Sequence, residues 1–233
     1  MPDLDHIISH PEVQTIVEET LPILINESDR GAVLVGLSVI DEQLYQLFDK
    51  LVPQNIGRKK KKEILDYNGF AGTLSSKLNT ALVCRLLPIY LIEAVHTLRK
   101  IRNRLAHAPS SFSLEENKQD IEYIYDQLGE NINSGLSQLA LQFVREMMID
   151  ELMKSGRPVH PFDLSKGKFA NQGEAIAYIQ SDKNLTKIYD LVEPKYKFAY
   201  GIALMCGLII SHRELLIDLL GGDRMISALK LGE

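Results

Sequence analysis

Residues 30–51 read RGAVLVGLSVIDEQLYQLFDKL, and this stretch sets the fold class. Its apolar residues recur every three or four positions, which is the spacing of one helix face. They are Val33, Leu37, Ile40, Leu44, Leu47, Phe48 and Leu51. Ser28 and Asp29 come just before the stretch and are residue types that commonly cap helix N-termini. The pattern therefore predicts a long amphipathic helix that buries one face against other elements.

The same helical period continues on both sides, and no stretch shows the alternation typical of a strand. It predicts helices over residues 11–26, 73–87, 89–106, 113–128, 132–153, 172–180, 183–191 and 194–220. Residues 155–167 hold two glycines and two prolines with little periodicity, which indicates a boundary. We therefore predict an all-α protein, with a helical bundle over residues 1–154 and a C-terminal helical extension over residues 155–233. The last helices either pack on the bundle or form a small second lobe.

Composition narrows the class of protein. The chain has 233 residues, of which 45% are hydrophobic and 24% charged, as is typical of a globular protein. The longest apolar run, residues 198–210, is shorter than the roughly 20 residues that cross a bilayer. It therefore predicts a buried core helix and no membrane association. The two cysteines are far apart in sequence and the N-terminus is acidic, so we expect a cytoplasmic protein.

Charge is unevenly distributed along the chain. The net charge is −5, yet residues 58–109 contain 11 basic and three acidic residues, a local net charge of +8. Such a segment in an acidic protein favours a docking site for a polyanion. The alternative is a solvated loop followed by one charged helix face. The residues predicted to bind nucleic acid are Arg58, Lys59, Lys60, Lys61, Lys62, Lys77, Arg99, Lys100 and Arg104.

Arg102 occupies an unusual place on the helical wheel of residues 89–106. It falls within an apolar stripe formed by Leu91, Val95, Leu98 and Leu105. A charge buried there without a partner is costly. Asp41 lies at the edge of the apolar stripe of residues 30–51, so we predict an ion pair between Asp41 and Arg102. The alternative is two independent exposed charges.

His107 precedes Ala108 and Pro109, and the α conformation is disfavoured before proline. We therefore expect the helix to end near Ala106, with the His107 ring able to turn toward Arg102 or Asn103. A histidine, an arginine and an asparagine together suit phosphodiester transfer. The histidine moves protons and the arginine stabilises phosphate charge, while RNA supplies its own 2′-hydroxyl nucleophile. Spacing alone equally fits a helix C-terminus that carries favourable cations.

Arg102-Asn103-x-x-x-His107 resembles the Arg-x(4–6)-His signature of the HEPN superfamily, including the polar residue after the arginine. Three ordered blocks resemble the mannitol operon repressor (MltR) branch of that superfamily. The first is residues 29–36 together with Asp41, the second is residues 69–78, and the third is residues 96–107. The resemblance extends over about residues 11–153 and does not include the C-terminal part.

This resemblance implies a HEPN-like helical bundle that dimerises, in a bacterial regulatory or effector protein. It implies a metal-independent endoribonuclease site shared between two protomers. Arg102 would bind phosphate, His107 would act as acid and base, and Asn103 would assist. The alternative function is a non-catalytic transcription regulator that acts through protein partners. No residues show metal-ligand spacing, so we expect neither a metal nor a cofactor.

Overall fold

The computed structural model describes residues 7, 9–53, 55–107, 112–155, 169–181 and 183–221, with only the backbone for residues 106, 107, 155, 181, 183–191 and 221. Within these residues every regular element is a helix, which confirms the predicted all-α fold. The helices are α2 (Pro11–Asn26), α3 (Asp29–Leu51), α4 (Arg58–Leu65), α5 (Leu74–Val83), α6 (Ile89–His107), α7 (Lys118–Leu128), α8 (Ile132–Ser155), α9 (Gln172–Ser181) and α10 (Lys183–Gly221).

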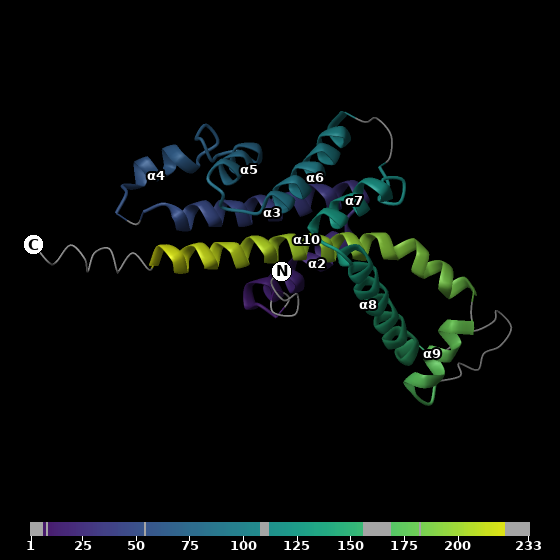
Figure 1. Cartoon of the computed structure of the whole chain (residues 1–233). Helices are drawn as coiled ribbons and strands as arrows, with labels where there is room; N and C mark the ends of the chain where they lie inside the picture. The colour runs from purple at the N-terminus through teal and green to yellow at the C-terminus, as the bar shows by residue number, and fades with distance from the viewer. Residues whose placement is uncertain are drawn as a thin grey trace, which may run out of the picture.

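Helix α10 runs through the middle of the molecule, where it packs against α2, α3 and α8 (Figure 1). Every residue from Tyr196 to Ile210 is buried except Tyr200, which is half-buried. This confirms that the apolar run of residues 198–210 forms a buried core helix. Its side chains belong to the same hydrophobic core as those of α3 and α6. A helix that is apolar on every side requires neighbours on every side, which explains its central position.

The C-terminal helical extension predicted over residues 155–233 includes α10, whose buried part packs into the main core. The described part of this C-terminal region separates into two differently placed helices. Helix α9 packs with the end of α8 in a small cluster of its own, which includes Ile149, Leu152 and Ile179. Helix α10 returns from there into the main core. The glycine- and proline-containing residues 156–168, which suggested a domain boundary, lie outside the described residues.

Most predicted helix boundaries agree with the structure to within a few residues. Thr73 caps α5 as expected, because its hydroxyl accepts the Ser76 N–H while the Ser76 hydroxyl accepts the Thr73 N–H. Three features differ from the prediction. The basic run forms the short helix α4, α7 begins at Lys118 instead of near Ser113, and the last two predicted helices are joined in α10.

Pro194 lies inside the N-terminal third of α10 and did not end the helix as the sequence suggested. Proline removes one backbone hydrogen bond and commonly kinks a helix. Figure 1 shows that α10 curves toward its N-terminal end. The packing of α10 against its neighbours offsets the lost bond, and the helix continues through the proline.

Three charged side chains of α10 tie it to the surrounding helices. Buried Arg213 donates to Glu12 Oε2 of α2 at 2.6 Å and to Gln46 Oε1 of α3 at 3.1 Å. Lys197 pairs with Glu122 of α7 at 3.5 Å, and Lys195 pairs with Asp29 at 3.4 Å.

None of the described helices combines the length and the hydropathy that a membrane-spanning segment needs.

Two glycine-to-alanine changes test how tightly α10 packs. A Cβ at Gly201 would overlap the ring of the fully buried Tyr125, so Gly201→Ala is expected to destabilise the fold by about 2 kcal/mol. A Cβ at Gly135 of α8 would meet no atom within 4 Å. Gly135→Ala is therefore expected to stabilise the fold by about 0.5 kcal/mol. Urea unfolding measures both, and equal midpoints for the two variants would contradict the packing described here.

Candidate functional site

Helix α6 carries the candidate site near its C-terminal end. Its buried residues are Leu91, Ile92, Ala94, Val95, Leu98, Ile101 and Leu105. Toward the C-terminal end of α6 the buried residues are Leu98, Ile101 and Leu105, so the buried face there points roughly 70° away from Arg102 around the helix. Arg102 consequently lies at its border and is exposed. Its guanidinium is available to a ligand and is not part of the core.

Arg102 and Asn103 are both exposed and contact each other. Arg102 Nη1 donates to Asn103 Oδ1 at 3.4 Å. Helix α6 ends at His107, so this residue lies at a helix end as predicted. Asn103 and His107 are four residues apart and therefore share one face of the helix. The predicted direction of the His107 ring concerns a side chain that is outside the described residues.

The predicted ion pair between Asp41 and Arg102 is not formed. Asp41 Oδ1 instead accepts a hydrogen bond from Lys77 Nζ of α5 at 2.8 Å. Lys77 is only 3% exposed, and its ammonium also lies 5.7 Å from the ring centroid of Tyr45. Asp41 thus has the ion-pair role predicted for it, but with a different partner. The prediction that Lys77 binds nucleic acid is wrong, because its charge is buried and already paired.

The basic run on α4 is mostly exposed. Arg58, Lys59, Lys60 and Lys62 are exposed, and Lys61 is half-buried in a 2.5 Å pair with Asp49 of α3. Lys60 and Lys62 make longer pairs with Glu63 and Asp66. The positive charges sit at the N-terminal end of α4, where the helix dipole disfavours cations. A bound polyanion would offset this repulsion.

The other cations of α6 have different environments. Lys100 is exposed, whereas Arg104 pairs with Asp120 of α7. Arg99 is half-buried, and its Nε has no hydrogen-bond partner among the described residues. Burial lowers the pKa of the nearby His96, and the positive charges of Arg99 and Lys100 lower it further. His96 is therefore neutral at physiological pH and adds no charge to this helix face.

The basic residues form two separate patches instead of one. The α4 patch lies near the C-terminal end of α3, to which Lys61 is tied through Asp49. The end of α6 lies near the other end of α3, because Arg104 pairs with Asp120 of α7 and the Leu114 N–H donates to Asp29. Asp29 and Asp49 are 20 residues apart in one helix, so about 30 Å separates the two patches.

Exposed aromatic side chains accompany the α4 patch and were not predicted as site residues. Tyr67 is 80% exposed and Phe70 is 60% exposed, in the turn that follows α4. Exposed aromatics beside cations are typical of surfaces that stack unpaired bases. The sequence feature that could have indicated these two site residues is their position a few residues after the basic run.

Among the described residues, no group of three or more His, Cys, Asp or Glu side chains is placed to hold a metal ion. Comparisons with protein-family profiles, with curated proteins and with solved structures found no match. The arrangement of α6 and α4 is therefore the basis for a functional proposal.

The pair between Asp41 and Lys77 predicts a specific pattern of stability. Asp41→Ala leaves the Lys77 ammonium buried without its carboxylate, so we expect a loss of about 2 kcal/mol. This is less than the 3–5 kcal/mol typical of a fully buried pair, because the Asp41 side chain is 38% exposed. Adding Lys77→Met to Asp41→Ala removes the unpaired charge and should restore most of the stability.

Urea unfolding of the single and double variants checks this prediction. The matched control is Asp150→Ala, which breaks the exposed pair between Asp150 and Lys154 and should leave the unfolding midpoint unchanged. A double variant no more stable than Asp41→Ala alone would show that the buried charge is not the cause.

Proposed function

We propose that this protein is a HEPN-type regulatory protein that acts on RNA, and that Arg102, Asn103 and His107 form a metal-independent endoribonuclease site. The observation that carries the proposal is the exposed pair of Arg102 and Asn103 one turn before the end of α6. An arginine freed from the core can bind a phosphate through several N–H groups. Asn103 orients the guanidinium, and His107 follows on the same helix face as Asn103.

The proposed reaction uses the RNA as its own source of nucleophile. The 2′-oxygen attacks the phosphorus as a histidine removes its proton, and the 5′-oxygen leaves with a proton from an acid. Arg102 stabilises the charge that develops on the phosphate oxygens. A homodimer that joins two α6 ends would supply one histidine as base and the other as acid. The products are a 2′,3′-cyclic phosphate and a free 5′-hydroxyl.

The exposed cations of α4 support RNA as the substrate class. They provide a sequence-independent attraction for phosphates, and Tyr67 and Phe70 offer faces for unpaired bases. An RNA that contacts both patches must reach about 30 Å along the molecule. We therefore favour single-stranded RNA that lies over α4 while its scissile bond sits at the end of α6.

A second candidate function is a non-catalytic regulator that acts through protein partners. It is favoured by exposed apolar side chains around α5. Val83 is 81% exposed and Ile89 is 59% exposed, and both flank the turn that joins α5 to α6. Isolated exposed apolar residues are normal, but a cluster favours contact with another protein. Absence of both RNA cleavage and RNA binding would favour this function.

The site itself predicts how cleavage depends on metal and on individual residues. Pure protein incubated with labelled single-stranded RNA in EDTA is expected to cut it and to leave cyclic phosphate ends. His107→Ala should lower the rate by at least about 100-fold, which is the smaller contribution usual for a general base or acid. Arg102→Ala should also lower the rate strongly, because it removes the phosphate ligand.

Two controls make the cleavage experiment specific. Arg145→Ala removes an exposed arginine of α8 far from the end of α6 in sequence, and it should cleave at the wild-type rate. DNA of the same sequence should stay intact, since it lacks the 2′-hydroxyl. Loss of cleavage in EDTA would point to a metal mechanism. Unchanged cleavage by His107→Ala would exclude this site as the active site.

Charge reversal in α4 predicts opposite effects on stability and on RNA binding. Lys59→Glu puts an acid in the first helical turn, which should stabilise the fold by about 0.5 kcal/mol. It should also weaken RNA binding and reduce the slope of log K against log salt by about 0.7, the value for one lost phosphate contact. Lys154→Glu in α8 makes the same charge change elsewhere and should leave the slope unaltered. Equal slopes for both variants would show that α4 does not contact RNA.

A further inference from the structure

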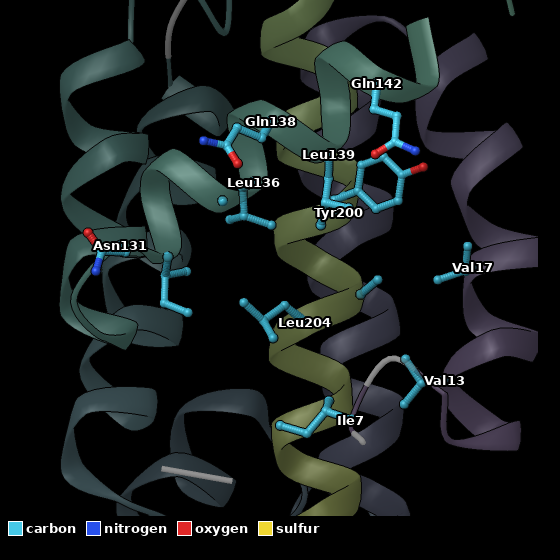
Figure 2. Close-up of a pocket in the computed structure, with 13 residues that line it drawn as sticks. Ile7, Val13, Val17, Asn131, Leu136, Gln138, Leu139, Gln142, Tyr200 and Leu204 are labelled. Carbon is cyan, nitrogen blue, oxygen red and sulfur yellow. The ribbon is translucent and has the colours of Figure 1, made fainter. Parts of the chain in front are cut away.

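An apolar cavity of about 370 Å³ opens between the N-terminal part of α2, the first turns of α8 and the middle of α10 (Figure 2). Most of its wall is aliphatic, with Ile7, Val13, Leu136 and Leu204 among the lining residues. None of the 13 described residues that line it is charged. A volume of this size, with an apolar wall and a few polar groups, is typical of small-molecule sites.

Three of the four polar residues in the wall gather toward one end of the cavity, and Asn131 lies to one side of it. Figure 2 shows Gln138, Gln142 and Tyr200 at this end and Ile7 and Val13 at the opposite end. Gln142 Nε2 donates to Glu146 Oε1 at 3.0 Å, which leaves the Gln142 carbonyl oxygen free to accept. Among the described residues none forms a hydrogen bond with the Tyr200 hydroxyl, so it is free to donate. Tyr200 and Gln142 thus offer one donor and one acceptor at this end, beside the amide of Gln138.

The same end disfavours a negative charge. Burial raises the pKa of Tyr200 to about 12, and the negative charge of Glu146 contributes to the rise. The hydroxyl is therefore protonated at physiological pH and acts as a neutral donor. A carboxylate bound here would lie near Glu146 without any cation in the wall to balance it, which is costly in an apolar cavity.

We propose that this cavity binds an uncharged amphiphile, whose hydrocarbon or aromatic body lies along Leu204 toward Ile7 and whose hydroxyl or amide head meets Tyr200 and Gln142. A hydroxyl or an amide both donates and accepts, which matches the two free groups. The apolar body replaces water along the aliphatic wall and supplies most of the affinity. The site is separate from α6 and α4 and does not depend on the proposed RNA function.

Fluorescence titration with N-phenylnaphthylamine, an uncharged apolar probe, tests the cavity. We expect saturable binding at one site per chain. Gly135→Leu should abolish it, because a side chain at Gly135 enters open space in the cavity without displacing the fold. Gly57→Leu is the matched control, since Gly57 also has no atom within 4 Å of its Cβ position and lies outside the cavity. It should bind the probe as the wild type does.

Competition tests the head group. Decanol should displace the probe at a concentration at least tenfold lower than decanoate, which has the same chain with a charged head. Tyr200→Phe removes the donor while keeping the ring, and it should weaken decanol several-fold without weakening the probe. Circular dichroism of each variant verifies that the helices are retained. If Gly135→Leu alters the fold, the loss of decanol affinity in Tyr200→Phe still tests whether the ligand binds in this cavity.

Three results would overturn the proposal. Absence of saturable probe binding would show that the cavity takes no apolar ligand. Equal binding by Gly135→Leu and Gly57→Leu would place the probe elsewhere on the protein. Displacement by decanoate as readily as by decanol would contradict the neutral head group.

Discussion

Burial of the apolar middle of α10 is the constraint on which the remaining structure depends. Thirteen consecutive residues, Phe198–Ile210, are apolar around the whole helix and therefore need neighbours on all sides. Helices α2, α3 and α8 supply those neighbours, and α7 contributes Tyr125 against Gly201. At about 25 cal/mol per Å² of apolar surface, this burial is the main favourable term in the stability of the bundle.

The charged residues of α10 are arranged around that buried segment. Lys197 and Arg213 flank it, and each is buried with an acidic partner on a neighbouring helix. Paired charges of this kind add little net stability, but they penalise any register in which the partners separate. The apolar segment thus drives association of the helices, while the flanking ion pairs select one alignment. The cavity lies between α2, α8 and this segment of α10.

The candidate RNA site lies away from the buried segment of α10. Helix α6 packs against α3, α5 and α7, and α4 packs against α3. Among residues 101–105 of α6 only Ile101 and Leu105 are buried, and Arg102 and Asn103 are exposed to solvent. The cations of α4 precede a turn with exposed aromatics and are not part of the hydrophobic core. Exposed polar side chains that do not pack in the core are available to bind a ligand. The chemistry assigned to them requires only an arginine, a histidine and the hydroxyl that RNA itself provides.

The sequence alone determined the helical class and most helix boundaries, because apolar spacing and capping residues act within a few positions. It also identified the exposed cations of α4 and the position of His107 at a helix end. Only the tertiary structure decided that α10 is central, that Asp41 pairs with Lys77, and that Arg102 is exposed. Those outcomes depend on which helix faces meet, and residues 36 or more positions apart have to be brought together first. Near the end of α6 only Ile101 and Leu105 of residues 101–105 are buried, which leaves Arg102 on the surface instead of in the core.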